Sequence, residues 1–153
     1  MPRQVDFQKP VVIAGITTRT TNAREMDPGT AALSGLWGRF YAEAPMSDES
    51  SRSKPVYSVY TEYESDFNGA YTVVIGREGA DKSKAQKVVT IAAGPYLEFI
   101  SSGPMPDAVI DGWKQVWSYF ADTKAHSRAY TTDFEYYDPA EPSTVRIYIA
   151  VSR

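Results

Sequence analysis

The stretch Thr131–Asp138, TTDFEYYD, has the composition of a half-buried strand, and it places a carboxylate among aromatic residues. Side chains alternate between the two faces of a strand, so Glu135 and Tyr137 share one face, while Phe134 and Tyr136 share the other. We expect the face with Phe134 and Tyr136 to pack against helices. Glu135 then either points to water or is the one charge in an otherwise apolar cavity.

The letters of this stretch recur earlier in the chain. Thr61-Glu-Tyr-Glu64 matches Thr132-Asp-Phe-Glu135, and Trp37-Gly-Arg-Phe40 matches Trp117-Ser-Tyr-Phe120. Each half also shows the same order of strand, helix, and two further strands, over residues of about 11–78 and 86–152. The sequence therefore predicts an α+β fold, a duplicated βαββ module with pseudo-two-fold symmetry. Such a module forms an antiparallel sheet with two long helices on one face and a groove between the halves.

Hydrophobic periodicity gives the individual elements. Strands are predicted over residues 11–18, 56–64, 71–77, 86–93, 96–102, 128–137 and 145–151. Apolar residues at helical spacing predict two amphipathic helices, one through Leu33, Leu36, Trp37, Phe40 and Tyr41 and one through Val109, Trp113, Val116, Trp117 and Phe120. Thr30 is expected to cap the first helix, and Asn68-Gly69 to form a hairpin turn. Residues 43–55 are expected to form a loop that could cover the groove.

Composition excludes several classes of protein. The chain has 153 residues, 42% hydrophobic and 23% charged, and we expect one domain spanning residues 1–153. A net charge of −3 without a long basic run does not suit a nucleic-acid binder. No apolar stretch has the length of a signal peptide core or a membrane span, so we expect a cytoplasmic protein without membrane contact.

Few residues suit metal or cofactor chemistry. There is no cysteine and a single histidine, His126, in a polar segment, so a catalytic role for His126 and a metal site are not expected. Phosphate-binding glycine loops are also missing, and no cofactor is predicted.

Acids among aromatics remain, and each has two interpretations. An enclosed Glu135 would take up a proton unless a cationic ligand held it ionised, whereas an exposed Glu135 would pair with a neighbouring Arg or Lys. Aromatic faces would add ~0.5–2 kcal/mol each to the binding of a cation. Trp37, Trp113 and Trp117 either pack between helix and sheet or form the wall of a cavity.

Three segments together resemble one known family. They are YESDFNGAYTVVIG (63–76), PYLEFISSGPMPDAVIDGWKQVWSYF (95–120) and YTTDFEYYD (130–138). Their order is similar to that of the GyrI-like, AraC-type effector-binding domains, and in particular the stand-alone, integron-associated effector-binding proteins. The resemblance covers about residues 11–152. It implies a curved sheet with a ligand groove between the halves, which binds hydrophobic, often cationic, drug-like molecules.

The resemblance also assigns site residues. The family has a signature acid in an F-E-x-Y-type strand, here Phe134-Glu135-Tyr136-Tyr137, which gives Glu135 the contact with the cationic centre. The aromatic wall of the groove corresponds to Trp37, Trp113, Trp117, Tyr60, Tyr130 and Tyr137.

The sequence and the resemblance leave three functions open. The preferred one is a binding protein without chemistry of its own. Some relatives carry a helix-turn-helix segment and regulate transcription in response to many drugs. Residues 1–10 are too short for that segment, so direct nucleic-acid binding is not expected; the protein would sequester ligands or act through an unidentified protein partner. The resemblance also implies one alternative, because some members of the family hydrolyse strained cyclopropane-containing natural products; Glu135 and Glu64 would then be the acid and the base. The other is inhibition of DNA gyrase.

Overall fold

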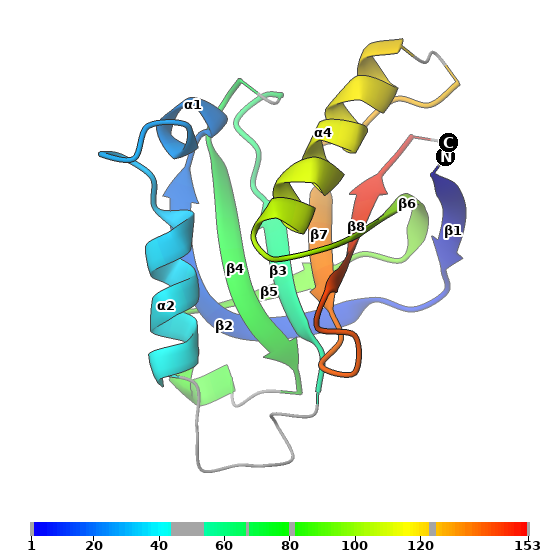
Figure 1. Cartoon of the computed structure of the whole chain (residues 1–153). Coiled ribbons are helices and arrows are strands. Elements are labelled where there is room, and N and C mark those ends of the chain that lie inside the picture. Colours follow the sequence, from blue (N-terminus) through cyan, green and yellow to red (C-terminus); the bar gives the residue numbers. More distant parts are fainter. Residues whose placement is uncertain (1, 44–53, 67, 80–81, 123–124, 153) are drawn as a thin grey trace.

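The computed structural model describes residues 2–43, 54–66, 68–79, 82–122 and 125–152 (Figure 1). The strands are β1 (Arg3–Phe7), β2 (Val11–Thr20), β3 (Val56–Thr61), β4 (Tyr71–Glu78), β5 (Lys87–Ile91), β6 (Gly94–Ser102), β7 (Thr132–Tyr137) and β8 (Thr144–Ala150). The helices are α1 (Asn22–Glu25), α2 (Leu33–Glu43), the 3-10 turn η1 (Lys82–Lys84) and α4 (Asp107–Asp122). Among the described helices, none combines the length and hydrophobicity that a membrane crossing requires.

The strands form one antiparallel sheet whose order is β1-β6-β8-β7-β3-β4-β2-β5. The order has a mirror relation: β6-β8-β7 of the second half repeats β2-β4-β3 of the first half in the opposite direction. The halves join where β3 pairs with β7, and Ser58 lies opposite Glu135 in this register. The predicted α+β fold with a duplicated βαββ layout is confirmed.

Both long helices cover the same face of the sheet (Figure 1). α2 packs on β2 and β4, and α4 packs on β6 and β8. α4 comes close to the sheet because its buried residues are small: Ala108, Gly112 and Val116. A Cβ at Gly112 would lie 2.7 Å from Cδ1 of Ile147 on β8. Because each helix sits over the outer strands of its own half, the central strands β3 and β7 lie between the two helices.

The opposite face has a core of its own, which overturns one expectation. Phe134 and Tyr136 do not face the helices: they point to the far side of the sheet, where Phe134 is buried. There the ring of Phe134 stacks on Tyr148 at 4.8 Å and contacts Phe7 of β1 at 5.9 Å. β1, which the sequence analysis missed, supplies this cover. Alternation gave the correct pairing of residues by face, but aromatic content did not identify the face with the helices.

Two strand boundaries differ from prediction for the same reason. β3 ends at Thr61 rather than at residue 64, and β7 begins at Thr132 rather than at residue 128. Glu62 and Tyr130, just outside these ends, have positive φ angles of 52° and 54°. A left-handed residue cannot continue a strand. Asn68-Gly69 consequently lies in a turn longer than a two-residue hairpin.

The start of α2 is also built differently from the prediction. Thr30 does not cap the helix; its hydroxyl donates to the carbonyl of Arg24. The carboxylate of Glu25 instead accepts hydrogen bonds from the N–H groups of Ala32 and Leu33. A carboxylate at this position balances the positive end of the helix dipole. Most of the predicted covering loop, residues 44–53, lies outside the described residues.

Candidate functional site

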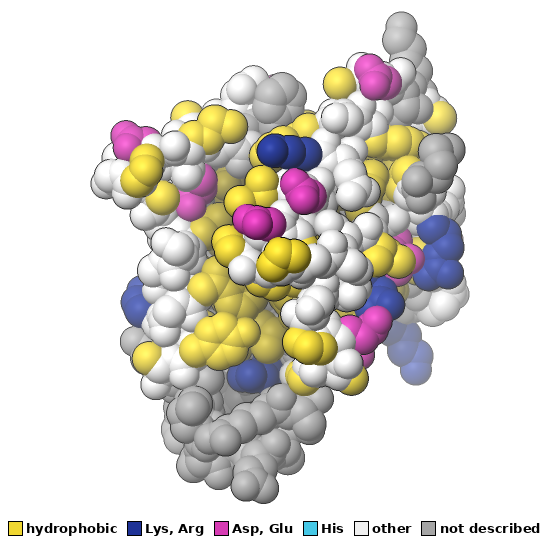
Figure 2. All heavy atoms as spheres, in the orientation of Figure 1, with side chains coloured by type: hydrophobic (Ala, Val, Ile, Leu, Met, Phe, Trp, Pro, Cys, Tyr) yellow, Lys and Arg dark blue, Asp and Glu magenta, His cyan; other side chains and the backbone are white. Residues whose placement is uncertain are grey.

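A cavity of about 220 Å³ lies between the two long helices, over the junction of β3 and β7. Figure 2 shows hydrophobic side chains gathered between the helices on this face. The lining residues are Asn22, Glu25, Leu33, Tyr60, Tyr63, Tyr71, Val109, Ile110, Trp113, Trp117, Arg128 and Glu135. The wall is mainly apolar and aromatic, with a few polar groups, as is usual for small-molecule sites.

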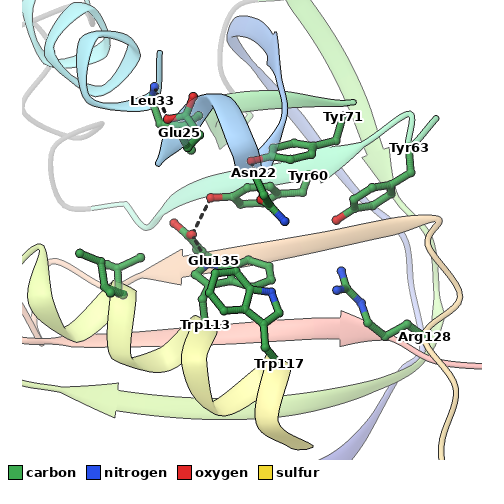
Figure 3. Close-up of a pocket in the computed structure, with 12 residues that line it drawn as sticks. Asn22, Glu25, Leu33, Tyr60, Tyr63, Tyr71, Trp113, Trp117, Arg128 and Glu135 are labelled. Carbon is green, nitrogen blue, oxygen red and sulfur yellow. Dashed lines mark hydrogen bonds between the residues drawn. The ribbon is translucent and has the colours of Figure 1, made fainter. Parts of the chain in front are cut away.

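Glu135 lies at the floor of the cavity and is 1% exposed (Figure 3). Three aromatic residues donate hydrogen bonds to its carboxylate. The Tyr60 hydroxyl and the Trp113 indole Nε1 each lie 2.7 Å from Oε2, and the Tyr137 hydroxyl lies 2.5 Å from Oε1. Tyr60 comes from β3, Trp113 from α4 and Tyr137 from β7, so both halves of the fold hold this one carboxylate.

Burial and hydrogen bonding act on Glu135 in opposite directions. Burial raises the pKa of its carboxyl group above the ordinary value of 4.5, although the three donors favour the ionised form and limit that rise. Burial, and then the nearby charge of Glu135, raise the pKa of the Tyr60 and Tyr137 hydroxyls well above their ordinary value. Both phenols therefore remain protonated donors near neutral pH.

Asp133 shows what Glu135 lacks. It lies two residues away on the same face of β7, is fully buried and accepts a 2.8 Å hydrogen bond from Arg128 Nη2. The Tyr63 hydroxyl donates to the same oxygen at 2.5 Å, and the guanidinium of Arg128 lies over the ring of Tyr130 at 4.4 Å. The Asp133 carboxylate thus accepts hydrogen bonds from a tyrosine and from a cation. Glu135 also accepts hydrogen bonds from aromatic residues, but in the described parts of the chain no Lys, Arg or His forms an ion pair with it.

The remaining charges give the cavity a negative balance. Glu25 lines its rim, with the carboxylate held by the first backbone N–H groups of α2. Arg128 also lines the cavity, but Asp133 neutralises it. Burial lowers the pKa of Arg128, and the charge and hydrogen bond of Asp133, together with Tyr63 and Tyr130, outweigh burial, so that the pKa is raised overall. The Glu135 carboxylate at the floor, which has no ion pair among the described residues, therefore faces a mainly apolar space.

The structure brings together some of the residues named from the sequence and separates others. Glu135, Tyr60, Trp113 and Trp117 line the cavity. Tyr137 reaches it only through its hydrogen bond to Glu135.

Trp37 and Tyr130 are not among the lining residues. Trp37 packs edge-on against Tyr137, with ring centroids 5.1 Å apart, and Tyr130 supports Arg128. Trp37 and Tyr130 therefore contact residues that support the site, and they do not line the cavity themselves. Trp37 follows the same stripe as Leu36 and Phe40, so periodicity alone does not separate it from a lining tryptophan.

Glu64 does not pair with Glu135. It is exposed in the turn after β3, where its carboxylate accepts a hydrogen bond from the N–H of Ala70. The sequence match between the two halves suggested equivalent positions for Glu64 and Glu135, but the strands differ. Thr61 is the last residue of β3, so Glu64 lies beyond the strand, whereas Thr132 is the first residue of β7, so Glu135 lies within it. His126 also lies away from the lining residues, with Nδ1 2.9 Å from the Tyr119 hydroxyl.

Sequence reasoning missed Arg128, Tyr63 and Glu25. It gave no role to Asp133, although strand alternation puts this residue on the face of Glu135. Arg128 could not be predicted as a partner of Asp133. It approaches Asp133 because the chain turns at Tyr130, and no sequence motif predicts that turn.

Comparisons with known proteins show the family of the chain. The family model described as integron-associated effector binding protein matches residues 8–151. The crystal structure of an integron cassette protein from the mobile metagenome of Vibrio cholerae is 40% identical, covers 99% of this chain and 95% of its own, and superposes with a TM-score of 0.88. YobU of Bacillus subtilis (strain 168), whose name provisionally calls it a transcriptional regulator, is 29% identical in an alignment over 150 residues that covers 92% of this chain and 91% of YobU.

A third relative shares the fold at lower identity. SAV2435, solved bound to tetraphenylphosphonium, is 21% identical, with a TM-score of 0.74 over 99% of this chain and 94% of its own. The family match spans nearly the whole chain, and the 40% identical structure extends over the same range. The chain therefore belongs to the family of integron-associated effector-binding proteins.

Proposed function

We propose that the protein captures hydrophobic cationic small molecules in the cavity over β3 and β7, with Glu135 as the counter-charge. The observation that carries this proposal is the contrast on β7. Asp133 is paired with the guanidinium of Arg128, whereas Glu135 is also buried and hydrogen-bonded but has no cation beside it among the residues that the structure describes. A ligand that carries a positive charge on an apolar frame would complete the arrangement.

The energetics favour such a ligand. A buried carboxylate without a counter-ion carries a desolvation cost, and a cation that enters the cavity offsets that cost. The indoles of Trp113 and Trp117 and the rings of Tyr60 and Tyr71 offer apolar surface and negatively polarised faces to it. A site that depends on one charge and an aromatic wall would accept ligands of many shapes. The tetraphenylphosphonium bound by SAV2435 is a compound of this class.

The test is a titration followed by intrinsic tryptophan fluorescence, since two tryptophans line the cavity. Methyltriphenylphosphonium is compared with triphenylphosphine oxide, a neutral compound of similar shape. We expect the wild type to prefer the phosphonium by on the order of tenfold or more, and Glu135→Gln to lose most of that preference.

Glu98→Gln is the matched control. Glu98 is also a buried glutamate that accepts a tyrosine hydroxyl, from Tyr148 at 2.6 Å, but it faces the other side of the sheet and pairs with Arg3. The control should keep the wild-type preference. Equal affinity of the wild type for both compounds, or an unchanged preference in Glu135→Gln, would refute the proposal.

As an effector-binding protein, the chain would act as a sensor or a sink for such compounds, or report to a separate partner. The hydrolase alternative loses its second acid, because Glu64 is exposed outside the cavity. It stays a prediction, tested by incubating the protein with a cyclopropane-containing electrophile and looking for the ring-opened product. Gyrase inhibition also stays a prediction, and a supercoiling assay with excess protein tests it.

A further inference from the structure

Arg128 and Glu135 mark two ends of the cavity. Figure 3 shows them well apart, with the indoles of Trp113 and Trp117 between them. Arg128 is held by Asp133, which lies two residues from Glu135 on the same strand face. Two residues of a strand span roughly 7 Å, so the backbone positions of Glu135 and of Asp133, which holds Arg128, are separated by about the length of one substituted benzene ring.

Arg128 has a donor to spare. Nη2 is used by Asp133, and Nε is enclosed by protein without a partner. Nη1 makes no hydrogen bond to the residues that the structure describes and is not enclosed, and the side chain lines the cavity. The guanidinium is also fixed in place, because it lies over the Tyr130 ring at 4.4 Å and near the Tyr63 ring at 6.0 Å.

The charge at this end selects the kind of group that Nη1 would meet. Asp133 already balances Arg128, and the Asp133 carboxylate is fully buried beside it. A ligand carboxylate would be placed near this second negative charge, whereas a neutral carbonyl oxygen would accept the hydrogen bond without that repulsion.

We infer that Arg128 is a second recognition point of the site. It selects elongated cations that carry a neutral hydrogen-bond acceptor, such as a ketone, ester or amide carbonyl, about one benzene ring away from the cationic centre. This inference rests on the proposed binding of cations at Glu135 and adds the chemical class of the ligand's other end.

The experiment compares two probes of nearly the same shape. (4-Acetylbenzyl)trimethylammonium carries the acceptor, and (4-isopropylbenzyl)trimethylammonium replaces the carbonyl oxygen by a methyl group. Dissociation constants are measured by calorimetry or by tryptophan fluorescence. We expect the wild type to bind the acetyl compound more tightly by on the order of tenfold, the value of one hydrogen bond to a charged donor.

Three variants separate recognition from a structural role. Arg128→Met removes the donor. The double variant Arg128→Met/Asp133→Asn removes the donor without leaving a buried carboxylate unpaired, and it serves if the single variant does not fold. Arg146→Lys, an arginine on the other face that pairs with Glu141, is the control. The ratio of the two dissociation constants should fall to about one in the first two variants and keep its wild-type value in the control.

A purely structural Arg128 would weaken both probes equally and leave their ratio unchanged, and that result would overturn the inference. So would a wild-type ratio of one. If that happens while the phosphonium preference at Glu135 holds, the proposed function stands and the second recognition point falls. Failure of the wild type to bind either ammonium probe would overturn the inference whatever the phosphonium result. A missing phosphonium preference is, separately, the failure of the proposed function.

Discussion

Asp133 and Glu135 project from the same face of β7, two residues apart, and of these two buried carboxylates only Asp133 is ion-paired within the described chain. Arg128 in effect occupies at Asp133 the position that we assign to a ligand at Glu135. The difference in pairing leads to predictions about pH, stability and donor groups, each of which can be measured on the purified protein.

Binding of a hydrophobic cation should weaken as the pH falls. The pKa of Glu135 is raised by burial, so its negative charge is lost at a higher pH than for an exposed glutamate. The affinity for methyltriphenylphosphonium should therefore decline as the pH approaches this pKa from above, while that for triphenylphosphine oxide stays level. Calorimetric titrations between about pH 4 and pH 8, a range that starts near the ordinary carboxyl pKa, give both curves. A phosphonium affinity that is flat across this range would contradict the role of Glu135.

Glu135→Gln should make the free protein less sensitive to pH between the ordinary carboxyl pKa and neutrality. Because the folded state holds the Glu135 proton more tightly than the unfolded state, this residue favours folding most at acidic pH. That contribution is lost as the pH rises through the raised pKa. Glutamine carries no charge to desolvate, so at about pH 8 the free energy of unfolding of the variant should equal or exceed that of the wild type. Urea unfolding at several pH values measures it, and a variant that is less stable than the wild type at the alkaline end would count against an uncompensated charge.

Arg128→Met should be much more destabilising than the removal of both partners. The single change leaves the Asp133 carboxylate buried without its cation, which costs about 3–5 kcal/mol of unfolding free energy. The double variant Arg128→Met/Asp133→Asn loses the charge as well, and its cost should be smaller by at least about 1–2 kcal/mol. The amide oxygen of the introduced asparagine could still accept the backbone N–H of Ala150, which Asp133 binds in the wild type. A double-mutant cycle in urea provides the coupling energy, and additive losses would show that the pair is not coupled.

Trp113→Phe tests the role of the indole N–H as a hydrogen-bond donor to Glu135, separately from the role of the aromatic ring in the cavity wall. The substitution keeps an aromatic ring but removes the N–H that lies 2.7 Å from Glu135 Oε2. Loss of a donor to the ionised form should raise the pKa of Glu135 further, so the pH at which phosphonium binding declines should move upward. Trp117→Phe, at a lining tryptophan with no hydrogen bond to Glu135, is the matched control. An equal shift in both variants would mean that ring size, not the donor, is responsible.

More of the fold than of the candidate site could be predicted from the sequence. The helical stripes that end at Tyr41 and Phe120 and the strand patterns gave the α+β class and the duplicated layout, because burial of one face imposes a period on the sequence. The hydrophobic period of a strand does not reveal which elements cover each of its two faces. Phe134 was therefore expected to pack against the helices, whereas it lies on the opposite face of the sheet. Glu135 stood out as an acid among aromatic residues and the family resemblance gave it a role, whereas alternation placed Asp133 on the same face without giving it one. Arg128 and Glu25 could not be found, because each reaches the site by the geometry of a turn or of a helix end.

The placement of the helices has a consequence for how such a site changes in evolution. Glu135 lies on the central strand pair, which is fixed by hydrogen bonds on both sides. The side walls of the cavity come from α4 on one side, and from α1 and the first residue of α2 on the other. The two long helices, α2 and α4, pack on the outer strands. A small shift of either helix, such as a larger residue at Gly112 would produce, changes the room available without moving the charge. The size of the cavity can thus change while the strand that carries Glu135 stays in place, but a shift of α4 also alters the hydrogen bond that Trp113 donates to Glu135, so size tolerance and charge preference are linked through this helix.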